Sequence, residues 1–442
     1  DLSHRNKKKA KNMRLNKKML AVTAVLAVGI LAGCGSSGTA ASTPASSAVP
    51  ASSHVAEEGV TEPINMLTWT LDDLDREDTV TFIPAEITSG VQGGNLTAKI
   101  FSYDLYKKED VEKDTYANPL FMEGASSSAI YHNGKYYYTH ETNEQIYLWV
   151  TTDITDMAHS TCKEVWVPKD PSNSHNLWNP EIRNINGKWY IYFAADDGNT
   201  DNHQIYVIEN DSPDPMQGEF RMKGAIMTNP DWNWGIHPST FEHKGELYLL
   251  WSGWPNRRIG SETQCIYIAR MENPWTLATE RVLISKPEYE WERQWVNPDG
   301  GRTAYPIYVN ESPQYFHSKD NRTVIVYYAA SGCWSPYYCT GMLTADADSD
   351  LLNPASWKKS PVPVLQQDPE NNVYGPGGIS FTPSPDGKEW YMLYHARQIP
   401  NDAPGASDSR SPRLQKIDWD KDGMPVLGTP QKEEEPMARP SG

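Results

Sequence analysis

The sequence lacks two features: an apolar run long enough to cross a membrane comfortably, and an excess of positive charge. The apolar run at residues 19–31 is shorter than the roughly 20 residues that a transmembrane helix needs. The 442 residues carry 57 Asp and Glu against 40 Lys and Arg, a formal net charge of -17. Because so acidic a surface repels nucleic-acid phosphates and anionic lipid, we expect no nucleic acid as a partner and favour neutral ligands such as sugars.

Helical periodicity and cysteine are also scarce. Beyond the N-terminal region, no stretch shows the sustained apolar periodicity of an α-helix, which argues against a helical domain. The sequence contains five cysteines, and one of them, Cys34, belongs to the N-terminal signal. Among the others, Cys333 and Cys339 are close enough in sequence to form a disulfide in a secreted protein, and buried free thiols are the alternative.

The N-terminal region is interpreted as a targeting signal. Basic residues precede the apolar run, which has the length of a signal-peptide core. The run ends in Leu31-Ala32-Gly33-Cys34, which resembles the bacterial lipoprotein signal with its acylated cysteine; an ordinary secretory signal with a chance cysteine is the alternative. We therefore expect a signal and anchor at 1–34, a flexible Ser/Ala/Pro-rich linker at 35–60, and a cell-surface protein whose only membrane contact is a lipid on Cys34.

Aromatic residues, by contrast, are abundant: the chain has 16 Trp and 24 Tyr. Many of them alternate along a segment type that occurs five times, in which a strand, a tight turn and an aromatic strand follow one another. The copies lie at 130–138, 182–192, 241–251, 315–328 and 381–394, with turns at Asn133-Gly134, Asn186-Gly187, Lys244-Gly245, Asp320-Asn321 and Asp386-Gly387. Each copy predicts a β-hairpin.

The spacing of these hairpins predicts the architecture. The turns recur every 50 to 80 residues, which is the length of a four-stranded blade with its loops. We expect an all-β fold, a five-bladed β-propeller at 117–431, with a β-sandwich as the less favoured alternative. A strand-rich segment of unknown role at 61–116 precedes it, and a tail at 432–442 follows.

Motifs in every predicted blade resemble those of glycoside hydrolase family 43, the arabinofuranosidases and xylosidases. They include Trp178-Asn-Pro-Glu-Ile182, Trp251-Ser-Gly-Trp254, Val309-Asn-Glu311, Ser331-Gly-Cys-Trp334, Tyr374-Gly-Pro-Gly377 and Tyr394-His-Ala396. The resemblance implies an inverting hydrolase whose pocket lies on the propeller axis. Such enzymes use a carboxylic acid to protonate the leaving oxygen and a carboxylate about 6.5–9.5 Å away to activate water.

The resemblance assigns the proton donor but leaves the other catalytic positions altered. Glu311 stands where the family places the general acid; a surface glutamate is the alternative. At the position of the base the chain has Ser126, which cannot deprotonate water at neutral pH, and at the position of the pKa-modulating Asp it has His237. A protonated His237 would lower the pKa of Glu311, the reverse of what an acid needs. Gly378 replaces an axial His that helps hold water or calcium in many relatives, so we expect no metal and no cofactor.

Other residues are weaker candidates for the site. A neutral His237 is an alternative base, because imidazole titrates near neutral pH. Carboxylates that could approach the axis are Glu181, Asp196 and Asp197, although such groups at blade edges are usually solvated, and His395 is more simply structural. Three tryptophans near the motifs, Trp178, Trp234 and Trp334, are candidate pocket walls against a sugar face, and packing between blades is the alternative for them.

Two functions remain open on the sequence. The first is an extracellular, monomeric glycosidase of the arabinofuranosidase type acting on the neutral plant polysaccharides arabinan or arabinoxylan. The second is a catalytically inactive propeller that binds carbohydrate, since Ser126 and His237 replace the two aspartates. Function resides in the site rather than in the fold, so the fold alone does not separate them.

Overall fold

The structure is a computed structural model that describes residues 114–442 apart from gaps at 122–123, 126–127, 143, 231–232, 257–261, 295–306 and 401–409. The predicted anchor at Cys34, the linker and most of the strand-rich segment lie outside the described residues, as does Ser126. The chain divides into two compact units, and the described residues fall in the unit made of Gly90–Tyr103 and Lys108–Gly442.

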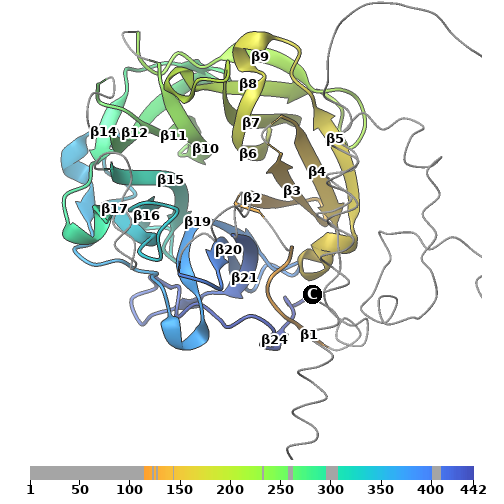
Figure 1. Ribbon diagram of the computed structural model, residues 1–442, viewed down its shortest axis with the longest axis vertical. Coiled ribbons are helices and arrows are strands. Elements are labelled where there is room, and N and C mark those ends of the chain that lie inside the picture. Colours follow the sequence, from red (N-terminus) through yellow and green to blue (C-terminus); the bar gives the residue numbers. More distant parts are fainter. Residues whose placement is uncertain are drawn as a thin grey trace, which may run out of the picture. The chain divides into compact units, whose positions relative to one another are not determined.

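Five antiparallel sheets stand as blades around a common axis, which confirms the predicted propeller and excludes the sandwich (Figure 1). The blades are β2 (Ser128–His132), β3 (Lys135–Glu141), β4 (Ile146–Thr151) and β5 (Thr161–Trp166); β6 (His175–Ile185), β7 (Lys188–Asp196), β8 (Gln204–Asn210) and β9 (Arg221–Ala225); β10 (Gly235–His243), β11 (Glu246–Gly253), β12 (Glu262–Asn273), β13 (Thr276–Leu277) and β14 (Val282–Ser285); β15 (Ile307–His317), β16 (Thr323–Ala330), β17 (Cys339–Asp346) and β18 (Lys358–Lys359); and β19 (Tyr374–Pro383), β20 (Trp390–Arg397) and β21 (Ser411–Lys416).

Short 3₁₀ helices and strand pairs complete the described elements. The helices are η2 (Ile154–His159), η3 (Pro171–Asn173), η4 (Thr200–Asn202), η5 (Glu290–Glu292), η6 (Pro354–Ser356) and η7 (Pro369–Asn371). The remaining strands are β1 (Thr115–Tyr116), β22 (Asp418–Trp419), β23 (Pro425–Val426) and β24 (Met437–Ala438). A short parallel pairing of β12 with β15, between Glu262–Gln264 and Ile307–Val309, joins the third and fourth blades.

The five predicted hairpins are present, and in three of them, at 133–134, 186–187 and 244–245, positive φ at both central residues explains the turn. A two-residue turn that matches the right-handed twist of its strands requires positive φ at both central residues. Asn133 and Gly134 have φ of 50° and 80°, and Asn186 and Gly187 have 52° and 79°. Asn and Gly adopt this left-handed region at low energetic cost, so these short sequences fix both the turn and the strand register.

Aromatic rings fill the spaces between neighbouring blades. Tyr137 of β3 lies 4.6 Å from Trp189 of β7, measured between ring centroids. Phe241 of β10 stacks on Tyr315 of β15 at 4.3 Å, and Phe316 of β15 stacks on Phe381 of β19 at 4.1 Å. Each such pair is worth about 0.5–1.5 kcal/mol beyond burial, so the alternating aromatics hold the ring of blades together as well as each blade.

The two ends of the described chain close the ring at the fifth blade. Strand β1 pairs with β24, and the chain after β1 runs beside β21, the outer strand of that blade. There Asn118 donates from Nδ2 to the Leu414 carbonyl at 2.9 Å and accepts from the Leu414 amide at 2.8 Å. Residues on both sides of the predicted 117–431 domain therefore contribute to the propeller.

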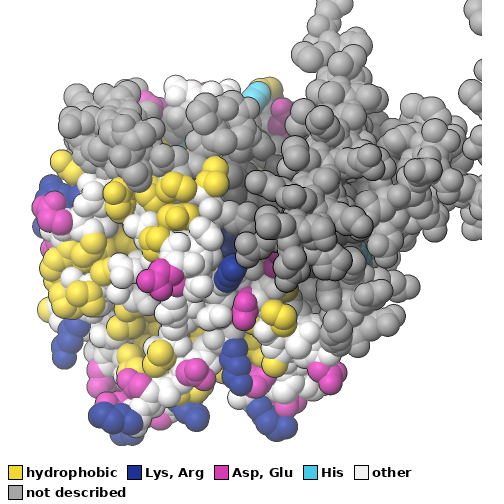
Figure 2. Space-filling model, turned by 60° about the horizontal axis from the view of Figure 1, so that its bottom comes forward, with side chains coloured by type: hydrophobic (Ala, Val, Ile, Leu, Met, Phe, Trp, Pro, Cys, Tyr) yellow, Lys and Arg dark blue, Asp and Glu magenta, His cyan; other side chains and the backbone are white. Residues whose placement is uncertain are grey.

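Charges of both signs are mixed on the surface of the propeller. Along the lower edge of the face in Figure 2, Lys and Arg lie among Asp and Glu instead of gathering into a basic stripe. No helix within the described ranges is long and apolar enough to cross a membrane. The Cys339 thiol is free, so the predicted alternative of a Cys333–Cys339 disulfide is not formed.

Candidate active site

The inner strands of all five blades surround a small cavity on the propeller axis. Its volume is about 40 Å³. The lining residues are Ala125 and Ser128 from the first blade, Asn179, Pro180 and Glu181 from β6, His237 and Pro238 from β10, Ser312, Pro313 and Gln314 from β15, and Gly378 and Ile379 from β19. Every blade therefore contributes to the lining of this cavity.

A repeated backbone irregularity turns these residues toward the axis. The register of the inner strand shifts next to Asn179, His237, Ser312 and Gly378. These four residues have φ of 54°, 51°, 50° and 60°. A β-bulge bends its strand and re-aims side chains, and a non-glycine residue in the left-handed region costs about 1–3 kcal/mol. The positive-φ conformation recurs at the same level of four blades; it is strained at Asn179, His237 and Ser312, whose polar side chains line the cavity, and unstrained at Gly378.

Glu311 and His237 meet at this level. The Nε2 atom of His237 lies 3.6 Å from Oε2 of Glu311, and both side chains are largely buried. The other ring nitrogen, Nδ1, is 2.7 Å from the Ser312 hydroxyl. In the neutral ring, Nε2–H therefore faces the carboxylate while Nδ1 accepts from Ser312. The structure thus brings together the two sequence-predicted residues at the acid and modulator positions.

The surroundings of Glu311 favour its charged form. Burial pushes the pKa of Glu311 upward, but His237, a hydrogen bond from Tyr338 and the charge of Arg410 outweigh burial, so the pKa lies below its ordinary value. The Tyr338 hydroxyl donates to Oε1 at 2.7 Å. Sequence reasoning missed Tyr338, which comes from the segment before β17, because nothing local marks it as an axial residue.

Glu181 lies in the cavity wall but is engaged by protein donors. Oε1 accepts from the Thr240 amide at 3.1 Å and lies 2.7 Å from Arg183, and Oε2 accepts from Gln314 at 2.5 Å. Burial raises the pKa of Glu181, against the opposing effects of Arg183 and these hydrogen bonds. The carboxyl group thus links β6, β10 and β15; that it also touches a ligand stays a prediction.

The predicted aromatic walls do not line the cavity. Trp234 is 4% exposed, stacks on Trp254 at 4.1 Å, and donates to the Thr200 carbonyl at 2.8 Å. Trp178 packs against His203, 4.2 Å away, and Trp334 is half-buried over Gly332. Trp234 therefore packs inside the protein, in agreement with the alternative of packing between blades.

Two other sets of candidates also stand away from the cavity lining. Asp196 is fully buried and accepts from the Asn176 amide at 2.9 Å, whereas Asp197 is exposed. His395 lies beneath Gly378, where a Cβ would come within 2.6 Å of its ring. Within the described ranges no group of three or more His, Cys, Asp or Glu is placed so that it could hold a metal ion.

Comparison with known proteins agrees with this geometry. The model for "Glycosyl hydrolases family 43" matches residues 116–425. An extracellular exo-α-(1→5)-L-arabinofuranosidase of Streptomyces chartreusis is 34% identical over 290 residues, which cover 64% of this chain and 83% of that protein. An α-L-arabinofuranosidase B of Pyricularia oryzae is 33% identical over 325 residues, 72% of this chain and 63% of that protein.

Solved structures show the same fold. The α-L-arabinofuranosidase from Lactobacillus brevis superimposes with a TM-score of 0.65 at 34% identity, covering 72% of this chain and 98% of that one. A thermostable family 43 glycoside hydrolase gives 0.59 at 22% identity, covering 74% and 100%. The fold and the axial site define a propeller of the glycoside hydrolase class. Within that class, the chain belongs to glycoside hydrolase family 43.

Proposed function

We propose that this protein removes terminal α-L-arabinofuranosyl units from arabinan-type saccharides, with Glu311 as the proton donor. The observation that carries the proposal is the position of Glu311 beside the axial cavity, where Tyr338 donates a hydrogen bond to it and it faces His237, which lines the cavity. Relatives named as exo-acting arabinofuranosidases, at 34% identity, support this choice of sugar and attack at a chain end.

The protonation state of the Glu311 carboxyl group limits how fast such a site works. Glu311 must carry a proton to act as an acid, yet its pKa is lowered, so the protonated fraction falls steeply as pH approaches neutrality. We therefore expect hydrolysis to be favoured on the acidic side of neutrality, where more of Glu311 carries its proton.

The experiment combines hydrolysis and binding on the same purified protein. Aryl α-L-arabinofuranoside and linear arabino-oligosaccharides are incubated with wild type and Glu311→Gln, and released arabinose is measured. Hydrolysis that is lost in Glu311→Gln supports the proposal, because that substitution removes the transferable proton at nearly constant shape. Hydrolysis that persists in Glu311→Gln would assign the chemistry to another residue.

One observation favours a second candidate, a propeller that binds arabinan without cleaving it. His237 holds Glu311 toward the ionised form, which suits hydrogen bonding to sugar hydroxyls better than proton donation. The relatives are named as enzymes, so the comparisons give this candidate no support. Micromolar binding of arabino-oligosaccharides by calorimetry, with no released arabinose across pH 4–8, would establish it.

We also propose that the protein works outside the cell as a monomer, anchored by a lipid on Cys34. Support comes from the Leu31-Ala32-Gly33-Cys34 tetrapeptide and from relatives named as extracellular. Expressed in a bacterium with labelled palmitate, the wild-type protein should incorporate label and Cys34→Ala should not. Equal labelling of both would remove the anchor from the proposal.

A further inference from the structure

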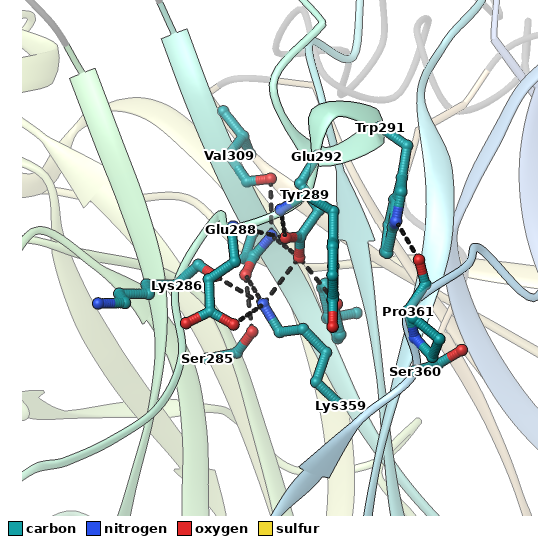
Figure 3. Close-up of polar contacts among 12 residues, drawn as sticks. Ser285, Lys286, Glu288, Tyr289, Trp291, Glu292, Val309, Lys359, Ser360 and Pro361 are labelled. Atoms are coloured by element: carbon teal, nitrogen blue, oxygen red, sulfur yellow. Dashed lines mark hydrogen bonds and ion pairs between the residues drawn. The ribbon is translucent and has the colours of Figure 1, made fainter.

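Asn310, the residue before Glu311 in β15, belongs to a buried polar group that the proposed reaction does not use. We call Ser285, Glu292, Asn310, Tyr328 and Lys359 the Glu292 cluster; Figure 3 shows Lys359 extended toward Glu292. The Glu292 side chain is fully buried, and Lys359 Nζ lies 2.9 Å from its Oε1. The members come from β14, η5, β15, β16 and β18, so the cluster connects the third and fourth blades.

The carboxylate of Glu292 is fully supplied with donors. Besides Lys359, the Tyr328 hydroxyl donates to Oε1 at 2.9 Å and the Asn310 amide donates to it at 3.0 Å. The backbone amides of Glu288 and Tyr289 donate to Oε2 at 2.6 and 2.8 Å. A buried polar network that is fully satisfied in this way enforces one geometry, because any displacement leaves a charge without partners.

Asn310 is the member that connects this cluster to the site. Its Nδ2 donates to Glu292 and to the Val309 carbonyl, each at 3.0 Å. Its Oδ1 accepts from the Ser285 hydroxyl at 2.7 Å and from Lys359 at 3.4 Å. Both amide protons and the carbonyl oxygen are therefore engaged, so the side chain has one orientation.

Asn310 immediately precedes Glu311 in β15. Successive side chains of a strand point to opposite faces, so fixing Asn310 in the cluster directs Glu311 to the other face, where it contacts His237 and Tyr338. Directly after Glu311 the strand bulges, with Ser312 at φ 50°. Strained backbone of this kind persists only where neighbouring contacts hold it. Asn310 holds the strand before the bulge, and Gln314, through Glu181, holds it afterwards.

We propose that Asn310, held by the Glu292–Lys359 ion pair, is a positioning residue that sets where the Glu311 carboxylate lies against His237 and Tyr338. The inference rests on the proposed function for its effect on catalysis. Its effect on the Glu311 carboxyl group is independent of whether the protein hydrolyses anything.

The test compares two substitutions of the same kind at fully buried asparagines. Asn310→Leu releases Glu311 from the Glu292 cluster, whereas Asn118→Leu removes the contacts with Leu414 at the ring closure, away from the pocket. Carbon-13 NMR of labelled glutamate carboxyl groups follows Glu311 directly, with its signal assigned by loss in Glu311→Gln. Urea unfolding of each variant measures the loss of stability.

We expect the pKa of Glu311 to rise toward its ordinary value in Asn310→Leu, because the contacts with His237 and Tyr338 loosen, and to stay unchanged in Asn118→Leu. Where wild type hydrolyses arabinosides, kcat of Asn310→Leu should fall by about 10- to 100-fold with little change in KM, as for a misplaced reacting group. An unchanged Glu311 titration in a folded Asn310→Leu protein would overturn the inference. A wild-type protein without hydrolytic activity would overturn the proposed function and leave this test intact.

Milder variants keep the test decisive if Asn310→Leu does not fold. Ser285→Ala removes one hydrogen bond to Asn310, and Lys359→Arg keeps the charge that Lys359→Met removes. The inference requires a rise of the Glu311 pKa in Ser285→Ala and near-normal titration in Lys359→Arg. If the titration follows overall stability in these variants, with no particular response in Ser285→Ala, the cluster is only structural.

Discussion

Glu311 lies between groups that act on it in opposite directions. Burial disfavours the ionised carboxylate, while His237 and the Tyr338 hydrogen bond favour it, and the balance places the pKa below its ordinary value. In an inverting glycosidase the acid needs a raised pKa so that it stays protonated. A histidine at this position therefore changes the electrostatic setting of the acid rather than removing the acid.

Substituting Tyr338 tests this balance. Tyr338→Phe removes a hydrogen bond that stabilises the charged carboxylate, so the pKa of Glu311 should rise. Activity that depends on protonated Glu311 is lost as pH rises through that pKa, so the alkaline limb of kcat/KM should move to higher pH. Tyr327→Phe, at a buried tyrosine whose hydroxyl forms no hydrogen bond, is the matched control and should leave the limb in place. Identical profiles for the two variants would contradict the assignment of Glu311.

Restoring both carboxylates should increase hydrolysis. Ser126→Asp supplies a base and His237→Asp supplies a negative charge that raises the pKa of Glu311; a positioned base is worth about 10²–10⁴ in rate. The backbone at 237 has φ 51°, a conformation that Asp tolerates better than most residues. Arabinose release by the double variant, compared with wild type and with Ser126→Asp alone, measures the effect. A folded double variant slower than wild type would show that another residue is the base.

At the scale of single residues, the sequence identified those whose role follows from a local motif. Glu311 and His237 were predicted from short segments and do meet at the axis. Tyr338 was not predictable, because its contact with Glu311 depends on how the segment before β17 folds back. Trp234 looked like a pocket wall only because it is near a motif; ring stacking on Trp254 decides its position.

At the scale of elements, the inner strands share a sequence feature whose meaning becomes clear only once the bulges are located in the structure. Three of the bulge residues, Asn179, His237 and Ser312, directly precede a proline. Proline lacks an N–H and is tolerated in a strand mainly at a bulge or an edge, so these dipeptides mark where the strand stops pairing and turns to the axis. The hairpins were predictable from the sequence alone, because turn pairs such as Asn133-Gly134 and Asn186-Gly187 carry the signal locally.

The fourth bulge, at Gly378, provides a test of how tightly this level is packed. Gly378→Ala places a Cβ within 2.6 Å of the His395 ring at φ 60°, whereas Gly187→Ala has similar backbone strain at φ 79° with no atom within 4 Å. Left-handed strain alone costs about 1–2 kcal/mol, so Gly187→Ala should lose that much. Gly378→Ala should lose a further 1–3 kcal/mol or so through overpacking. Urea unfolding measures both, and equal losses would mean that His395 moves aside freely.

At the scale of the whole molecule, the number of blades was predictable and the closure of the ring was not. Five hairpins at regular spacing indicate five blades. The partner of the last blade depends on long-range pairing: β1 meets β24, and Asn118 meets Leu414, almost 300 residues away. No local pattern encodes such contacts, which explains why residues 432–442 were interpreted as a tail although they bind the propeller.

Removing residues 432–442 should therefore open the ring. The deletion eliminates β24 and also Glu433, which pairs with the fully buried Arg413 of β21. Leaving one partner of a buried ion pair alone costs about 3–5 kcal/mol, and β1, which precedes the first blade, additionally loses its strand partner. We expect a large fall in melting temperature, measured by calorimetry, and earlier hydrogen exchange in β21 than in β7. Glu433→Gln, which keeps β24, should show only part of the fall. A truncated protein that melts like wild type would show that the ring stays closed without this segment, through the contacts of Asn118 and Leu120 with β21 alone.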